Sequence, residues 1–404
     1  MKQISIAAIG LGCRGYALLR DILTKMPQYR IDSVCDVYPD RIERAAGIVE
    51  KNCGYRPFGT TDYHELLGRS SVDLCMIFTS WTSHTGLAVE AMEAGKAVAM
   101  EVGGAHTLEE CQKLVGTWEK TRMPFFFLEN CCFGKRETMV LHMVRRGMFG
   151  EIVHCRGGYR HDLRTEIAYG RENRHYRLEE YKAYNRENYP THELGPIAKV
   201  LDLGRGNRIV SLASFASKAA GMEAFIRDRK PDDETLRGVH FAQGDIVTTI
   251  LRCEDGQTVQ MTLDTTLPRS YSRDFSVYGT LGMYSEESDS IFIDKVSKEY
   301  WSAAPTWGNA KEYEDYLVPH WKDVARGVTE VGHGGMDWFE MEVLADCLLK
   351  GNPSPLDVYD AAMMMAVSPL SEKSIREGGA VQAFPDFTGG AWKTRPVLDV
   401  LPLE

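Results

Sequence analysis

A glycine-rich turn near the N-terminus constrains the fold of this chain more than any other feature. Residues 4–9 form a short apolar run rich in β-branched side chains, and the sequence GLGCRG (residues 10–15) follows before a helical segment. In such a strand–turn–helix unit, Gly10 permits the tight turn, Gly12 lets a pyrophosphate approach the backbone, and Gly15 lets helix and strand pack closely. The helix N-terminus then offers N–H groups and the positive end of its dipole to the phosphate.

An acidic residue stands at the distance that such a turn requires. A second apolar segment, residues 31–35, ends at Asp36, which follows Gly15 by 21 residues. An acid about 20 residues after the turn binds the ribose 2′-hydroxyl of a dinucleotide, and its charge repels a 2′-phosphate. The sequence therefore predicts NAD(H) rather than NADP(H). The alternative, a glycine turn with an acid downstream by chance, does not explain why all four features agree.

Length and charge limit the classes of function. A chain of 404 residues predicts two to three domains. The net charge of −10 and the lack of a basic stripe argue against a nucleic-acid partner. No apolar run approaches the roughly 18 residues of a membrane span, so we expect no membrane partner. No secretion signal is visible, and the ten cysteines show no C-x-x-C pair, which favours reduced thiols in the cytoplasm.

The first third of the chain alternates apolar strands with helices, which predicts an α/β Rossmann domain with a parallel, doubly wound sheet over residues 1–128. The expected strands are residues 4–9, 31–35, 72–78, 96–100 and 124–128. The expected helices include residues 39–51, 85–93 and 108–120. Ligands bind such sheets outside the carboxyl ends of the strands. We therefore expect these ends to surround one cofactor: Gly10, Asp36, residues 79–84, Glu101 and residues 129–130.

The remaining sequence predicts two further parts. Residues 129–310 are expected to form an α+β domain with an open, mainly antiparallel sheet, whose strands cover residues 152–159, 210–217, 245–253, 258–265 and 275–278. Residues 161–188 are a polar excursion, a length of loop that is uncommon unless functional. A helix is expected over residues 191–203. Residues 311–404 are expected to pack back on the first two domains as helices 316–329, 336–350 and 358–376.

Three polar clusters could carry chemistry: residues 129–133, 158–164 and 189–196. Tyr189 and His192 are three residues apart at a helix start, where their side chains can point the same way. A phenol and an imidazole at one cleft are candidate proton-transfer partners. Tyr159 and His161 are further catalytic candidates.

Some candidates keep more than one interpretation. For His161 and His333, a functional role and a purely structural role both stay open. Glu193 beside His192 could suggest a metal ligand, but spacing fixes no second ligand, so we predict no metal site.

These residues resemble glycoside hydrolase family 109, the NAD-dependent α-N-acetylgalactosaminidase-like branch of the glucose–fructose oxidoreductase and inositol dehydrogenase superfamily. The resemblance covers nearly the whole chain. The matching stretches are residues 81–84, 101–102, 129–134, 159–164, 176–178, 189–192, 271–273, 332–337 and 383–387. The chain has Glu101-Val102-Gly103 where most of the superfamily has Glu-Lys-Pro. Gly103 replaces the proline usual in the family, and Glu193 replaces the usual glycine.

The resemblance implies roles for individual residues. The implied NAD contacts are Arg14, Gly15, Asp36, Trp81, His84, Glu101, Val102 and Asn130. The implied sugar-binding residues are Tyr159, Arg177, Tyr189, His192 and Tyr271. Within the superfamily, the exposed face of the second domain's sheet often forms a dimer surface, so we expect a homo-oligomer, a dimer or a tetramer.

The reaction implied is a redox-neutral hydrolysis of glycosides: oxidation at sugar C3, loss of the C2 proton and of the C1 group, addition of water, and reduction of C3. Two alternatives stay open. One is an NAD-dependent sugar or polyol dehydrogenase, which the missing Glu-Lys-Pro lysine disfavours. The other is a non-catalytic NAD-bound sensor, which would not need the Tyr, His and Arg side chains of residues 159–192.

Overall fold

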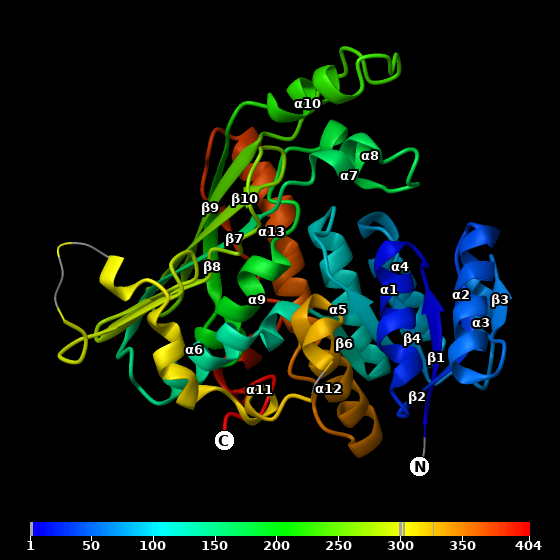
Figure 1. Cartoon of the computed structure of the whole chain (residues 1–404), viewed down its shortest axis with the longest axis horizontal. Coiled ribbons are helices and arrows are strands. Elements are labelled where there is room, and N and C mark those ends of the chain that lie inside the picture. The colour runs from blue at the N-terminus through cyan, green and yellow to red at the C-terminus, as the bar shows by residue number, and fades with distance from the viewer. Residues whose placement is uncertain (1–2, 299–300, 302–303, 326) are drawn as a thin grey trace. The chain divides into compact units, whose positions relative to one another are not determined.

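The structure is a computed structural model that describes residues 3–298, 301, 304–325 and 327–404 (Figure 1). The chain divides into two compact units. Unit 1 comprises residues 1–138, 318–363 and 398–404, and unit 2 comprises residues 139–317 and 364–397. The three-part division at residues 128 and 310 stays a prediction.

Unit 1 contains a six-stranded, fully parallel sheet in the order β3-β2-β1-β4-β5-β6 (Figure 1). The strands are β1 Ile4–Ile9, β2 Tyr29–Cys35, β3 Phe58–Thr60, β4 Leu74–Ile77, β5 Ala97–Glu101 and β6 Phe125–Leu128. The strand order reverses between β1 and β4, which is the switch point where doubly wound sheets bind nucleotides. This arrangement confirms the predicted fold class of the N-terminal part.

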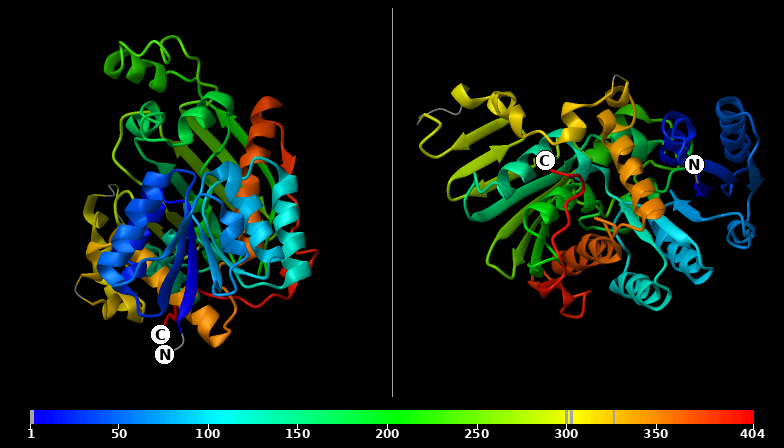
Figure 2. Two further views of the ribbon diagram at one scale, coloured as in Figure 1. Left: turned by 90° about the vertical axis from the view of Figure 1, so that its right-hand side faces the viewer. Right: turned by 90° about the horizontal axis from the view of Figure 1, so that it is seen from below.

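Helices pack along this sheet, as the two views of Figure 2 show. They are α1 Cys13–Asp21, α2 Pro39–Cys53, α3 Tyr63–Leu67, α4 Trp81–Glu93, α5 Leu108–Thr121 and α12 Met336–Lys350. Helix α4 begins four residues before the predicted residue 85, so part of the expected loop 79–84 is helical. The reason is that Trp81 is buried, which the polar sequence around it does not suggest, and Ser80 bonds to the Ser83 side chain in the first turn. Helix α6, Lys135–Arg145, and helix α13, Val358–Arg376, each contribute residues to both units.

Unit 2 is built on an eight-stranded sheet in the order β13-β12-β11-β7-β10-β9-β8-β14. The strands are β7 Ile152–Arg160, β8 Ile209–Ala216, β9 Ile246–Cys253, β10 Thr258–Asp264, β11 Ser276–Gly279, β12 Gly282–Ser285, β13 Ser290–Ile293 and β14 Gln382–Ala383. Only the β7–β10 pair is parallel among the described pairings, so the prediction of a mainly antiparallel sheet is confirmed. The sequence did not predict β12, β13 and β14, which are only two to four residues long.

Four helices accompany this sheet: α7 Arg164–Ala168, α8 Arg177–Ala183, α9 Thr191–Val200 and α10 Gly221–Arg229. The predicted polar loop 161–188 therefore contains two short helices, α7 and α8. Helix α9 packs on β7 at Gly157, where an added Cβ would lie 2.9 Å from the carbonyl oxygen of Glu193. This close approach places the first turn of α9 directly against the strand.

The predicted helix over residues 316–329 is wrong. Among the described residues of this stretch, only α11, Pro319–Lys322, is α-helical, and Arg326 lies outside the described residues. Pro319 begins a new helix instead of continuing one, and Gly327, with φ +96°, has a backbone that an α-helix does not contain. The helices predicted over residues 336–350 and 358–376 are correct. Within the described residues, no helix combines the length and the apolar character needed to cross a bilayer.

Candidate active site

The turn after β1 needs its glycines. Gly10 has φ +91°, and an added Cβ would lie 2.7 Å from the carbonyl carbon of Phe78. A Cβ on Gly15 would lie 2.1 Å from the carbonyl oxygen of Gly10, so helix α1 could not pack this closely on β1. A Cβ added at Gly12, by contrast, would have Nη1 of Arg41, 3.7 Å away, as its nearest described neighbour. No side chain makes a capping hydrogen bond at this end of α1. The backbone at Gly12 therefore leaves room for a phosphate at the start of α1.

Asp36 is fixed beside this turn. Its carboxylate accepts hydrogen bonds from the N–H groups of Leu11 at 2.7 Å and Tyr38 at 3.0 Å, and Nη1 of Arg41 lies 3.6 Å away. The residue is only 6% exposed, so its orientation is well determined by its surroundings. An acid in this place matches the ribose-binding position of an NAD site.

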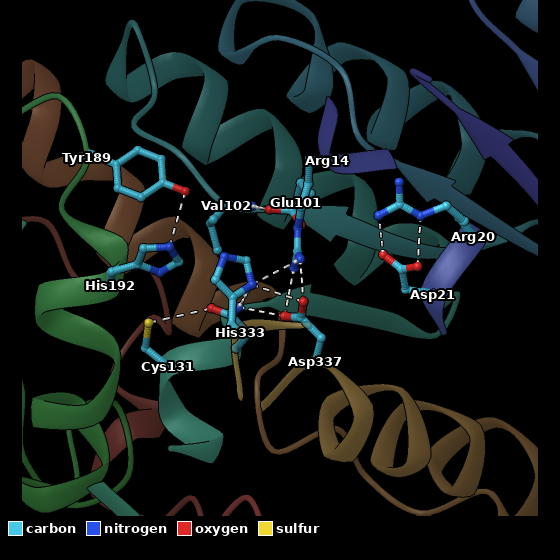
Figure 3. Close-up of polar contacts among 11 residues, drawn as sticks. Arg14, Arg20, Asp21, Glu101, Val102, Cys131, Tyr189, His192, His333 and Asp337 are labelled. Carbon is cyan, nitrogen blue, oxygen red and sulfur yellow. Dashed lines mark hydrogen bonds and ion pairs between the residues drawn. The ribbon is translucent and has the colours of Figure 1, made fainter. Parts of the chain in front are cut away.

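Arg14, Glu101 and Asp337 meet in one polar network within unit 1 (Figure 3), and Asn130 joins this network through Asp337. Nε of Arg14 donates to Glu101 at 2.5 Å, while Nη1 and Nη2 donate to the two carboxylate oxygens of Asp337 at 2.6 and 3.0 Å. The amide of Asn130 donates to Asp337 at 2.6 Å. Asp337 therefore binds Arg14 and Asn130, two of the residues that the resemblance assigns to the cofactor. Arg14 in turn binds the third, Glu101.

Asp337 and His333 received no role from the sequence, although both lie in the matched stretch 332–337. Nδ1 of His333 lies 2.9 Å from Asp337, and the backbone of His333 has φ +47°. Burial opposes the charge of Asp337, but the Arg14 guanidinium and the His333 hydrogen bond outweigh it and hold the pKa of Asp337 well below its usual range. Asp337 is thus ionised, and its carboxylate holds Arg14, Asn130 and His333 together.

The start of α4, which follows β4, and the segment after β5 contain the remaining candidates of unit 1. Gly103 has φ +150°, and an added Cβ would lie 2.1 Å from Cδ1 of Trp81, so Trp81 depends on glycine at this position. The N–H of Val102 donates to the Glu101 side chain at 3.0 Å. His84 is fully buried, and burial together with the nearby His106 lowers the pKa of His84 to about 3, so it is neutral.

Several buried polar atoms near these segments lack a partner among the described residues. They are Oγ1 of Thr79, both ring nitrogens of His84 and Oγ1 of Thr85. Buried polar groups are normally hydrogen-bonded, so such atoms indicate a missing ligand or ordered water. Together with the open backbone at Gly12 and the position of Asp36, they fit a dinucleotide at the carboxyl edge of this sheet.

Unit 2 brings its candidates together as two phenol–imidazole pairs. The hydroxyl of Tyr189 lies 3.3 Å from Nε2 of His192 (Figure 3), and the hydroxyl of Tyr159 lies 3.4 Å from Nδ1 of His161. The rings of Tyr159 and Tyr189 have centroids 4.4 Å apart, so the two pairs are neighbours. In each pair a proton can pass between a phenol and an imidazole.

The other two predicted sugar-binding residues border these pairs. The guanidinium of Arg177, in α8, lies 5.3 Å from the ring centroid of Tyr189, and its Nε lies 3.2 Å from Glu166. Tyr271 packs edge-on against His161 with ring centroids 5.1 Å apart, and it is 51% exposed. Burial and the charge of Arg177 lower the pKa of His161, which favours its neutral form. All six unit 2 candidates therefore form one cluster.

Comparison with known proteins identifies two families that this chain matches. Residues 4–127 match the family described as "Oxidoreductase family, NAD-binding Rossmann fold", and residues 133–394 match "Glycosyl hydrolase 109, C-terminal domain". Among solved structures, a levoglucosan dehydrogenase in complex with NADH has a TM-score of 0.68 at 15% identity, covering 95% of this chain and all of that one. The apo scyllo-inositol dehydrogenase of Lactobacillus casei has a TM-score of 0.65 at 14% identity, covering 95% of this chain and 98% of that one. At such identities these structures show the fold alone.

Curated relatives show the family. A "Glycosyl hydrolase family 109 protein" of Stenotrophomonas maltophilia is 36% identical, covering 98% of this chain and 91% of its own length. An "Alpha-N-acetylgalactosaminidase" of Tannerella forsythia is also 36% identical, covering 95% of this chain and 86% of its own length. The chain therefore belongs to glycosyl hydrolase family 109, and it carries the C-terminal domain of that family behind an NAD-binding Rossmann domain.

Proposed function

We propose that this glycosidase hydrolyses α-N-acetylgalactosaminides or related glycosides by a redox-neutral route. The observation that carries the proposal is the cluster of two phenol–imidazole pairs in unit 2, in a chain whose unit 1 is built for NAD. The substrate class is supported by the name of the Tannerella relative. A conventional glycosidase instead needs two carboxyl groups on either side of the glycosidic bond. In this cluster, Glu166 pairs with Arg177 and the buried Glu193 accepts the N–H of Tyr159.

NAD, when bound, supplies a hydride acceptor and later a hydride donor for sugar C3. The residues that would hold it are those at the carboxyl edge of the parallel sheet. Gly12 and the start of α1 would receive the pyrophosphate, and Asp36 the adenosine ribose. Arg14, Glu101 and Asn130 are fixed by their shared network and offer a preorganised polar surface.

The side chains of unit 2 carry the proton transfers in this proposal. One pair takes the C3 hydroxyl proton as C3 is oxidised to a ketone, and the ketone makes the C2 proton acidic. A base removes that proton, and the C1–O bond breaks with a proton delivered to the leaving oxygen. Water then adds at C1 while C2 regains a proton, and C3 returns to an alcohol, so the reaction consumes only water.

We assign these proton transfers to Tyr189 with His192 and to Tyr159 with His161. Arg177 and Tyr271 orient the sugar. Arg177 is only 8% exposed and its guanidinium lies 5.3 Å from the ring centroid of Tyr189, so its positive charge would stabilise a phenolate that forms when a tyrosine of the cluster gives up its proton.

The test is incubation of the purified protein with p-nitrophenyl α- and β-glycosides, N-acetylgalactosaminides included, while nitrophenol and NADH are followed together. We expect nitrophenol release without net NADH, and loss of this release when NAD is stripped and its return when NAD is added. NADH accumulation on free sugars without nitrophenol release would contradict the proposal and identify a sugar dehydrogenase.

We also propose that the protein is a cytoplasmic homo-oligomer. Its ten cysteines are free thiols, which suits a reducing compartment. On the sheet face away from α9, Phe215 of β8 is 62% exposed and Ile250 of β9 is 41% exposed, and the strand register places them on the same side. A second copy of the chain would cover them. Sedimentation should show a dimer or tetramer that Phe215→Glu dissociates, whereas Leu349→Glu in unit 1 leaves it intact.

A further inference from the structure

Two buried carboxyl groups lie behind the phenol–imidazole pairs. Glu187 is fully buried in the segment before α9, and Glu193 in the first turn of α9 is 1% exposed. Their carboxyls face each other. Carboxylates are almost never fully buried unless they are paired, so this arrangement calls for an explanation.

Glu193 connects two elements of the proposed active site. Its Oε1 accepts a hydrogen bond from the backbone N–H of Tyr159 at 2.8 Å, and its own backbone follows His192 directly. Its carbonyl oxygen lies where only Gly157 can face it on β7. One residue thus fixes the first turn of α9 to β7 at the point where the rings of Tyr159 and His192 have centroids 5.7 Å apart.

The surroundings contain little positive charge to balance two carboxylates. From β7, the Arg160 guanidinium and the Tyr159 N–H act on Glu193. The N–H groups of Tyr189 and of Leu263 in β10 approach Glu187, without completing a hydrogen bond of ordinary geometry to either of its oxygens.

Helix α13 binds the backbone of Glu187 and not its carboxyl. The Glu187 N–H donates to the Ser371 hydroxyl at 2.8 Å, and the Ser368 hydroxyl donates to the Glu187 carbonyl at 2.6 Å. Glu187 itself is therefore held in place from both sides of its backbone.

Two buried carboxyls in contact cannot both ionise easily, because burial and mutual repulsion both penalise the second charge. Burial raises the pKa of Glu187 from 4.5 to about 8. Burial, together with the charge of Glu187, raises the pKa of Glu193 well above its usual range. The pair therefore holds at least one proton at neutral pH.

We propose that Glu187 and Glu193 share a proton and act as a positioning pair, which holds the Tyr159 backbone against α9 and so sets the spacing of Tyr159 and His192. The catalytic consequence rests on the proposed function, whereas the shared proton does not. In alkaline solution the pair loses this proton, the two carboxylates repel each other, and the positioning of Tyr159 is disturbed.

The first test detects the proton itself. Infrared difference spectra at pH 7 between the wild type and the double variant Glu187→Gln/Glu193→Gln should show a protonated carboxyl band that the variant lacks. Glu340 of α12, also fully buried with a pKa raised by burial and by Asp337, contributes a band that remains in both spectra. Identical carboxyl bands in the wild type and the variant would overturn the proposal, whatever the enzymatic activity.

The second test uses the pH dependence of thermal unfolding. The folded pair keeps a proton that the unfolded chain releases above about pH 4.5, so its contribution to stability is lost as the pH rises from there towards 8. The double variant Glu187→Gln/Glu193→Gln has no carboxyl to titrate at these two positions, so its unfolding temperature should fall less between pH 5 and 8. The surface variant Glu179→Gln, at a residue paired with Lys182 and exposed to solvent, should follow the wild type.

The third test separates positioning from folding. Glu193→Gln keeps an oxygen for the Tyr159 N–H, and it should retain kcat within about threefold while its alkaline loss of activity moves to higher pH. Glu193→Ala removes that oxygen and should lower kcat by about tenfold or more, since small displacements of catalytic groups are costly. Equal kcat values for the two variants, with an unchanged pH profile, would contradict the positioning role. An inactive wild type would refute the proposed function and leave the first two tests valid.

Discussion

Asp337 accepts hydrogen bonds from both terminal nitrogens of Arg14, at 2.6 and 3.0 Å, across 323 residues of sequence. The carboxylate side chain is only 1% exposed and the Arg14 side chain 27%. The pair therefore fixes the second segment of unit 1, residues 318–363, to the turn that follows β1.

Asp337→Asn should destabilise the protein and weaken NAD binding. The change removes one of the two carboxylates that Arg14 binds and leaves Glu101. Breaking a largely buried ion pair costs about 2–3 kcal/mol when one partner keeps some solvent contact. Urea unfolding and NADH titration calorimetry would measure the two effects. Asp21→Asn is the matched control, because Asp21 pairs with Arg20 on the surface and should change stability by less than about 0.5 kcal/mol.

The same ion pair has a defined pH dependence. Because the pKa of Asp337 is lowered in the folded state, its contribution to stability is present above the unfolded pKa of 3.8 and is lost as the pH falls below it. The stability difference between the wild type and Asp337→Asn should therefore shrink below about pH 4. A constant difference from pH 3 to pH 7 would argue against this assignment.

Gly103→Ala should displace Trp81. The added Cβ would lie 2.1 Å from the indole, and φ +150° is strained for alanine, so we expect a loss of at least about 2 kcal/mol and weaker NAD binding. A shift in tryptophan fluorescence together with calorimetry would detect both changes. Gly116→Ala, in the middle of α5 with no atom near its Cβ position, should be neutral or stabilising by about 0.5–1 kcal/mol. Unchanged fluorescence in Gly103→Ala would show that Trp81 tolerates a side chain there.

Much of the fold could be predicted because its signals are local. The strand over residues 4–9, the glycine turn and the helix over residues 336–350 follow from residues close together in the sequence. The helix predicted over residues 316–329 is wrong because Pro319 and Gly327, which are themselves local signals, interrupt the apolar spacing. The start of α4 was missed because the burial of Trp81 depends on its packing against Gly103, and not on its neighbours in sequence.

The candidate site was predictable to a similar extent. The contact of Tyr189 with His192 follows from their spacing of three residues, and the resemblance supplied the other members of the cluster. The Asp337 anchor depends on a tertiary contact with Arg14 that no periodicity encodes. Glu187 and Glu193 look like ordinary polar residues in the sequence, because only the packing of α9 on β7 reveals that both are buried.

Asp36→Asn should lower the affinity for NADH and weaken the discrimination against NADPH. The amide can still accept the Leu11 N–H, so the turn is preserved, but the negative charge that favours the ribose and repels a 2′-phosphate is lost. Removing a charged hydrogen-bond acceptor should reduce NADH affinity about tenfold or more. Titrations with NADH and NADPH would measure the ratio. Asp32→Asn in β2, whose carboxylate binds Arg69, should leave the ratio unchanged, and an equal effect of both substitutions would contradict the role of Asp36.

His192→Ala should abolish turnover while NAD remains bound. The imidazole is one half of a proton-transfer pair with Tyr189, and removing such a group typically costs about 10²- to 10⁴-fold in rate. Tyr189→Phe keeps the ring but removes the hydroxyl, so it should lower kcat with little change in NADH affinity. His64→Ala in unit 1 is the matched control. The ring of His64 also neighbours a tyrosine, since its centroid lies 4.1 Å from that of Tyr63, but the His64 side chain is largely exposed. Nitrophenol assays and NADH titration together test the assignment, and near-normal turnover in His192→Ala would remove this imidazole from the mechanism.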